Sequence, residues 1–347
     1  MRPVVAIVAT RPETVAEDYR RLLDLAGFAP DPDGRGQLVA AQAQGRGWLS
    51  GSGCPPWQLD AVLERLSPDG GGNLLVGAVE RGPGLRRADL RSWGWDEVLA
   101  RHGLPAEALP AAEPVRVHAQ QPLPSLTAAM PGGPAVPAPL IGRGLVLLAV
   151  PALRPAWPIA GAVALLRHLI LGPLPRLARI PVAEVTAEVV GLARDVCGPL
   201  PAVLDAVIWD TSAVSGDAGV TARHVLLASS DAVALDAVVV RLAGGDPLRI
   251  PWLQLCRQRG LGAVADDEIR LAGQTELLSL DFGLRRAAFS GDLSGRLRLP
   301  GWPGGPLLRR RDRRRRDRQD LAAGPWGQLF AAYRQGTVHE NPTTESS

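Results

Sequence analysis

The fold class is indicated most clearly by two segments, AVLDAVIWD at residues 202–210 and SSDAVALDAVVV at residues 229–240. The first is a nearly continuous apolar run that ends in Asp210, which is typical of a strand buried on both faces of a sheet. The second opens with short acceptor side chains, which favour a helix N-terminus, and continues as an apolar helix. Together they predict a layered α/β structure.

The same alternation of strand and helix extends outward from these segments through most of the 347 residues. We predict strands at residues 4–9, 38–41, 74–79, 144–150, 202–209 and 225–228. We predict helices at residues 13–26, 57–66, 97–102, 161–171, 182–197, 230–242 and 251–260. Regular alternation of this kind indicates an α/β fold with a mostly parallel sheet and helices on both faces.

The composition changes twice along the chain. Residues 104–139 are rich in Pro and Ala and suggest an irregular insertion within an α/β region that spans residues 1–300 in one lobe or two. Residues 301–347 hold a Pro/Gly linker, an Arg-rich run and a polar end, so we expect a disordered basic C-terminal tail. Within it, Trp326, Leu329, Phe330 and Tyr333 have helical spacing and could dock on the body or on a partner.

Several chemistries are excluded by residues that the chain lacks. All 38 basic residues are arginine, so neither a pyridoxal-type Schiff base nor a Walker-type phosphate loop can form. The three cysteines, Cys54, Cys197 and Cys256, are far apart, which argues against an Fe–S cluster, a structural zinc site and a secreted disulfide scaffold. The apolar stretch at residues 4–9 is too short for a secretion signal. We therefore expect a cytoplasmic protein.

Two apolar stretches could suggest a membrane span, but neither is suited to it. The stretch at residues 144–153 is about half the length that a spanning helix needs, and the stretch at residues 157–171 contains Arg167 and His168. We expect no membrane span.

The formal net charge of +3 arises from one segment. Arg309–Arg318 holds eight arginines and two aspartates, a local charge of +6, so the rest of the chain carries −3. Such a run could neutralise nucleic-acid phosphates, but no aromatic residues interleave it for base stacking. It is the chain's candidate for nucleic-acid contact, although a solvated tail is the simpler interpretation.

A ligand site is predicted where the strand at residues 202–209 ends. Asp210 is followed by a loop of small residues that contains Ser215 and Asp217. In open α/β sheets, ligands bind in the crevice beyond the carboxyl ends of the strands. Asp210 and Asp217 are thus candidate ligand or metal contacts; a flexible turn would have the same composition.

The helix at residues 230–242 adds further candidates. Ser229 and Asp231 stand at its start, where Asp231 is either an N-cap or a ligand contact. Asp236 lies amid an apolar helix face, where an unpaired carboxylate would cost several kcal/mol. It is therefore either a buried acceptor for backbone amides or an arginine, or a contact for a ligand or metal, with Asp210, Asp217 and Asp236 as the metal candidates.

Basic and imidazole groups complete the candidate set. Arg154 and Arg167 could bind an anion through their guanidinium forks. His168 lies in an apolar helix, where a satisfied core or interface residue is commoner than a ligand.

Residues 202–273 resemble the C-terminal core of the domain-of-unknown-function 362 family. A strand ending in Asp leads to Gly216-Asp217-Ala218-Gly219, a segment of the type S-x-D-x-V-A-x-D follows at residues 229–236, and Gly244–Pro247 and Gly260-Leu261-Gly262 complete the pattern. Looser similarity brings the extent to about 300 residues. The resemblance implies the α/β fold, but the family's name records that its activity is not established.

Several family motifs are replaced in this chain. The Lys-Pro-Asn after the second strand is missing, the Lys-x-His pair appears as Arg154-Pro155-Ala156, and the Lys and Asn of a central element are Arg167 and His168. The ferredoxin-like Cys-rich module that many members carry is absent too.

Three functions remain open from the sequence. The first is the binding of a small anionic ligand or metal at the strand carboxyl ends, with or without catalysis. The second is a non-catalytic family member that acts as a binding or scaffold protein, which the replaced motifs favour. The third is association with nucleic acid through the Arg-rich tail.

Overall fold

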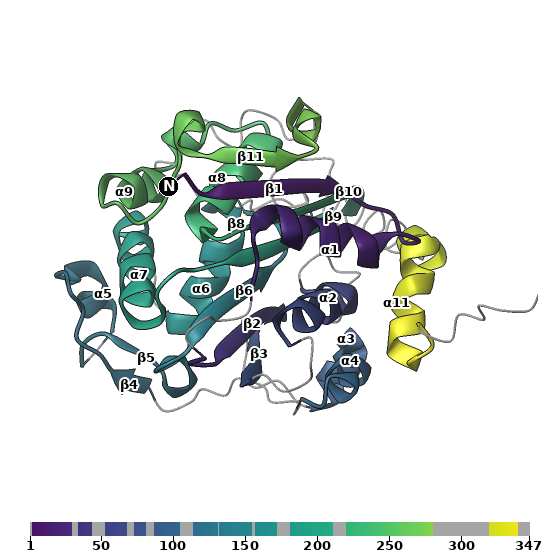
Figure 1. The fold of residues 1–347 in the computed structure, drawn as a ribbon. Coiled ribbons are helices and arrows are strands. Elements are labelled where there is room, and N and C mark those ends of the chain that lie inside the picture. The colour runs from purple at the N-terminus through teal and green to yellow at the C-terminus, as the bar shows by residue number, and fades with distance from the viewer. Residues whose placement is uncertain are drawn as a thin grey trace, which may run out of the picture.

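The fold is a single mixed sheet between two helical layers. It was obtained as a computed structural model, which describes residues 2–29, 34–43, 53–67, 73–80, 87–104, 114–130, 132–154, 157–171, 181–210, 220–279 and 319–338. The main sheet has the strand order β11-β1-β10-β9-β6-β2-β3 (Figure 1). The bounds of these strands are β1 Val4–Ala9, β2 Gln37–Ala43, β3 Leu74–Glu80, β6 Gly144–Ala149, β9 Ala202–Asp210, β10 Val220–Ser229 and β11 Arg270–Gly273.

The predicted mostly parallel sheet is confirmed. The pairs β2–β3, β2–β6, β6–β9 and β1–β11 are parallel, whereas β10 is antiparallel to both β9 and β1. Along this path six of the seven strands therefore point the same way and only β10 runs against them. In Figure 1, β1 runs from left to right, so the carboxyl edge of the sheet is on the right.

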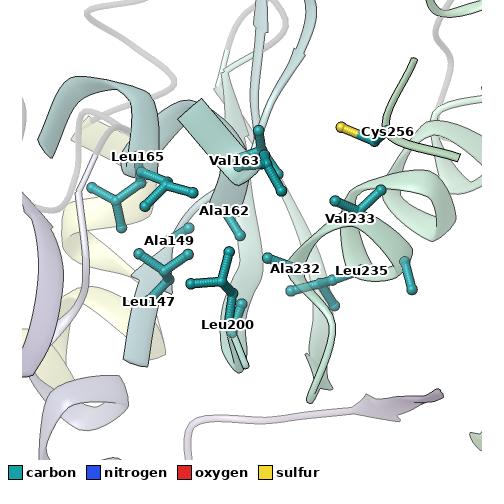
Figure 2. Close-up of a cluster of buried hydrophobic side chains, with 14 of the residues drawn as sticks. Leu147, Ala149, Ala162, Val163, Leu165, Leu200, Ala232, Val233, Leu235 and Cys256 are labelled. Atoms are coloured by element: carbon teal, nitrogen blue, oxygen red, sulfur yellow. The ribbon is translucent and has the colours of Figure 1, made fainter. Parts of the chain in front are cut away.

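One helical layer covers each face of the sheet, because successive strand residues point to opposite faces. On one face, Ile7, Leu147 and Leu204 pack against helices α6 Ala162–Leu171, α7 Val182–Cys197, α8 Ala232–Leu242 and α9 Pro251–Gln258. Figure 2 shows part of this layer, where Ala149 and Leu147 of β6 face residues of α6 and α8.

On the other face, Val8, Ala41 and Val203 pack against a second set of helices. These are α1 Val15–Ala26, α2 Pro56–Leu66, α3 Arg87–Trp93, α4 Trp95–Arg101 and α11 Pro325–Gln335. The predicted arrangement of helices on both faces is thus confirmed.

The strand β10 is longer than predicted and forms a hairpin with β9. Val220 pairs with Asp210, and Ser229 pairs with Ala202. Polar Thr221, Arg223 and His224 obscured its first half in the sequence, because that half interrupts the apolar pattern of a buried strand. As a consequence, Ser229 lies at the end of the sheet opposite to Asp210.

The Pro/Ala-rich insertion contains regular structure that the sequence did not indicate. Strands β4 Pro114–Arg116 and β5 Ala135–Pro137 form a small antiparallel pair, and helix α5 Pro124–Ala129 lies between them in sequence. Two short strands β7 Ala152–Arg154 and β8 Trp157–Ala160 extend the main sheet after β6.

The C-terminal region includes a docked helix. Trp326, Phe330 and Tyr333 of α11 are buried against the body, which was one of the two docking alternatives that their spacing indicated. The expectation of a disordered tail over residues 301–347 was therefore wrong for Pro325–Gln335, because these apolar side chains gain a packed helix by covering the body. The Arg309–Arg318 run lies outside the described residues. Within the part of the chain that the structure describes, no helix is long and apolar enough to cross a membrane.

Candidate functional site

The topology of the sheet creates a switch point between the neighbouring strands β2 and β6. The chain leaves the carboxyl end of β2 toward α2 on one face, whereas the first helix after β6 is α6 on the other face. Where adjacent parallel strands lead to helices on opposite faces, a crevice opens between their connections, and ligands in α/β proteins bind there. The carboxyl ends of β2 and β6 are therefore the candidate functional site.

Two glutamine side chains hold this switch point together. The buried Oε1 of Gln42, at the end of β2, accepts from Val150 N at 3.3 Å. From the first turn of α2, Nε2 of Gln58 donates to Ala149 O at 3.2 Å and to Val203 O at 3.0 Å. Ala149 is the last β6 residue paired with β9, so Gln58 bridges the two strands just where their ladder ends.

The second amide atom of Gln58 has no such partner. Gln58 is fully buried, and among the described residues no donor reaches its Oε1. A buried acceptor without a donor is costly, and it marks a position where a ligand or water could be bound.

The carboxylate of Asp205 in β9 is fully buried and anchors helices α1 and α2, which cover the same face of the sheet. Its Oδ2 accepts from Tyr19 Oη of α1 at 2.8 Å and from Trp57 Nε1 of α2 at 2.9 Å. Its Oδ1 accepts from Val207 N at 3.0 Å. Three donors satisfy this carboxylate, so its contribution is to fix α1 and the start of α2 against the sheet.

Burial changes the protonation of this cluster. It raises the pKa of Asp205 to about 6, although the hydrogen bonds from Trp57, Tyr19 and Val207 oppose the shift. Burial also raises the pKa of the nearby Cys54 thiol well above its ordinary value, and the charge of Asp205 adds to that effect. Cys54 is therefore a neutral thiol and not a nucleophilic thiolate.

Helix α11 covers this cluster from outside, near the carboxyl edge of the sheet (Figure 1). The ring of Trp326 lies 5.3 Å from that of Trp57, and its Nε1 donates to His224 Nδ1 at 2.9 Å. Tyr333 Oη donates to Asp60 Oδ2 of α2 at 3.2 Å. The C-terminal helix thus packs directly on the helix that follows β2.

Asp236 is a backbone anchor, as one of its two sequence interpretations predicted. It is fully buried on α8, and its two oxygens accept from Ala162 N at 2.9 Å and from Val163 N at 3.0 Å. These are the first amides of α6, which have no partner within their own helix. Burial raises the pKa of Asp236 to about 7, against the lowering effect of those two hydrogen bonds.

The close approach of Asp236 explains why residue 161 is glycine. A Cβ atom at Gly161 would lie 2.1 Å from Asp236 Oδ1, far closer than any permitted contact. The carboxylate and the glycine therefore form one feature that fixes the start of α6.

Asp231 and Ser229 also act on the backbone, and their expected position must be corrected. Asp231 caps α8 by accepting from Val233 N and Ala234 N, and it also accepts from Ala263 N at 3.0 Å. Ser229 Oγ accepts from Asp231 N at 3.1 Å. Because β10 runs against the other strands, both residues lie at the amino edge, and they do not join a crevice at the carboxyl ends.

The other predicted site residues are only partly placed. Asp210 ends β9 at the carboxyl edge and Arg154 ends β7, while their side chains lie outside the description. Ser215 and Asp217 fall outside the described residues altogether. Arg167 is buried and His168 half-buried, both on α6 in the layer that contains α7 and α8.

The metal site expected from Asp210, Asp217 and Asp236 stays a prediction, because only the side chain of Asp236 is described. In the described ranges, no three His, Cys, Asp or Glu side chains are grouped so that they could hold a metal ion. Comparison with protein-family models, with curated proteins and with solved structures finds no match for this chain.

Asp205 and Gln58 were not among the functional candidates predicted from the sequence. The signal for Asp205 was present, because a carboxylate inside the apolar run AVLDAVIWD requires a buried partner just as Asp236 does. No comparable signal marks Gln58, since its importance comes from the place where β6 and β9 separate.

Proposed function

We propose that this protein binds a small anionic ligand at the carboxyl ends of β2 and β6. The observation that supports this most is the switch point itself, because the helices after these two adjacent strands lie on opposite faces of the sheet. This is the ligand class expected from the sequence. We propose a different position for it, at the end of β2 in place of the end of β9.

The connection between β2 and α2 has a composition suited to an anion. Residues 44–53 read QGRGWLSGSG, with four glycines, two serines and Arg46. Glycines allow backbone amides to approach an anion closely, and a strand–glycine-rich connection–helix order is common to phosphate sites. Residues 44–52 lie outside those that the structure describes. Since the chain has no lysine, we propose Arg46, from the sequence alone, as the residue that supplies the positive charge.

The surrounding structure would hold such a site rigidly. Trp57, in the first turn of α2, is bound to Asp205, and the adjacent Gln58 is bound to two strands. A binding site fixed by packed side chains loses little entropy when its ligand binds. The unpartnered Gln58 Oε1 would accept a hydrogen bond from a ligand hydroxyl or amide, or from a bound water.

The family resemblance stays part of the proposal. If this chain is a member of the domain-of-unknown-function 362 family, then Asp231 and Asp236 of the S-x-D-x-V-A-x-D segment serve folding in it. Their oxygens accept five backbone amide hydrogen bonds between them. The segment would then identify the fold and not a ligand set.

The test is a calorimetric titration with pyrophosphate at constant ionic strength. It compares three proteins: the wild type, Arg46→Gln and Arg21→Gln. Arg21 is an exposed residue of α1 and serves as the matched control. We expect wild type and Arg21→Gln to bind alike and Arg46→Gln to bind at least tenfold more weakly. Equal binding by all three variants, or no binding beyond that of chloride, would refute the proposal.

A further inference from the structure

A hollow lies at the amino edge of the sheet, away from the switch point. It has a volume of about 310 Å³ and lies between α7, the C-terminal end of α9 and the chain that precedes α5. A smaller hollow of about 80 Å³ adjoins it and shares Arg194 and Leu261 with it. In Figure 1 this region is on the left, beside α7 and α9.

Two arginines line the larger hollow, and neither is neutralised by an ion pair. Arg194 comes from α7 and donates to Gly260 O at 3.3 Å, and Arg259 follows α9. In the described part of the chain, no carboxylate lies within 4.0 Å of either guanidinium. Their forked donors are available for an oxyanion.

The carboxylates around the hollow already accept hydrogen bonds from backbone amides. Glu188 is buried and accepts from Ser125 N and Leu126 N, the first amides of α5. Asp195 accepts from Gln120 N at 2.9 Å. These carboxylates keep their charge, but the backbone amides occupy their oxygens, so the two guanidinium groups are the charged donors that an anionic ligand could engage.

The rest of the lining is mixed, with polar Gln120 and Gln121 beside a small apolar wall. Leu123, Ala187 and Leu261 contribute carbon surface, and Gly191 leaves space in the middle of α7. A Cβ at Gly191 would meet only Leu261, at 3.7 Å, so the absence of a side chain there keeps the hollow open and is not required by the packing.

We infer that this hollow binds a small organic carboxylate with a short apolar body. The guanidinium groups match the carboxylate, and the apolar side chains match the body. The site is separate from the β2–β6 switch point and shares no residue with it, so either proposal can fail without the other.

The experiment is calorimetry with butyrate, acetate and inorganic phosphate at equal ionic strength. The variants are Arg194→Gln/Arg259→Gln, Gly191→Leu, and Arg249→Gln as an exposed arginine outside the hollow. Gly191→Leu fills the hollow with a good helix former, so it should not lower the melting temperature. Melting temperatures of all variants are recorded alongside.

We expect butyrate to bind more tightly than acetate, and phosphate to bind most weakly. Both site variants should weaken butyrate binding at least tenfold, while Arg249→Gln should match the wild type. The inference is overturned if butyrate binds no better than chloride, if phosphate binds most tightly, or if Gly191→Leu with an unchanged melting temperature still binds butyrate normally.

Discussion

Asp205 and Asp236 are both completely buried, yet they lie on opposite faces of the sheet and satisfy their oxygens in different ways. Asp236 accepts hydrogen bonds from two backbone amides of α6, which cannot reorient. Asp205 accepts hydrogen bonds from two side chains and one backbone amide. Both carboxylates nevertheless have the same structural role. Each of the two helices that flank the switch point, α2 and α6, is fixed near its start by a buried carboxylate.

The difference between their donors has consequences for substitution. A backbone N–H cannot turn away or accept a hydrogen bond, so a substitution that removes an acceptor oxygen at Asp236 leaves at least one of the two amides without a partner. The hydroxyl of Tyr19 can rotate and can both donate and accept. The Asp205 cluster should therefore adapt to changes that the Asp236 anchor cannot tolerate.

The largest effect is expected for Asp236→Ala. It leaves two buried amides without acceptors and removes buried volume, so the free energy of unfolding should fall by about 3 to 5 kcal/mol. Urea unfolding at pH 5.5 measures it, with Asp246→Ala, an exposed cap, as the control. A loss below about 1 kcal/mol would show that the amides of Ala162 and Val163 are satisfied in another way.

The pH dependence of stability should be nearly as large. Both folded pKa values, about 6 for Asp205 and about 7 for Asp236, lie above the ordinary value of 3.8. Between those limits the folded state binds more protons than the unfolded state, so the free energy of unfolding should decrease as pH rises from 4 to 7. One pKa unit corresponds to about 1.4 kcal/mol, so a loss of several kcal/mol is expected from the two groups together.

Urea unfolding of the wild type and of Asp236→Asn between pH 4 and pH 8 checks this. Asparagine does not titrate, so the stability difference between the two proteins should shrink as pH rises. A constant difference across that range would mean that Asp236 has an ordinary pKa.

A smaller effect is expected for Asp205→Asn. With its amide oxygen at the Oδ2 position, the asparagine can still accept from Trp57 and Tyr19, and only the bond from Val207 N is lost, so the loss should be about 1 kcal/mol. Asp236→Asn should cost about twice as much, because its amide oxygen can keep only one of two donors and neither of these can reorient. Parallel urea titrations compare the two variants, and a larger loss for Asp205→Asn would contradict the proposed difference between the clusters.

Local patterns in the sequence were sufficient to predict the layers of the fold. The apolar runs at residues 4–9, 144–150 and 202–209 and the amphipathic helices between them specify strands and helices through their own composition. The docking of α11 was likewise anticipated by the spacing of Trp326, Phe330 and Tyr333.

Strand direction was not available from those patterns. The long β9–β10 hairpin reverses one strand and carries Ser229 and Asp231 to the amino edge, far from Asp210. Asp210 and Asp231 are close together in the sequence, whereas the register of the sheet places them at opposite edges. The same holds for the switch point, since neighbours β2 and β6 are about a hundred residues apart in the chain.

Amide hydrogen exchange at Ala162 and Val163, measured by NMR on the wild type and on Asp236→Asn, tests the central claim most directly. First-turn amides of a helix ordinarily exchange fast because they lack intrahelical acceptors. We predict that in the wild type these two amides are protected as strongly as the interior of α6, and that Asp236→Asn removes this protection first. Fast exchange of both amides in the wild type would contradict the claim that the buried carboxylate of Asp236 fixes the start of α6 beside the switch point.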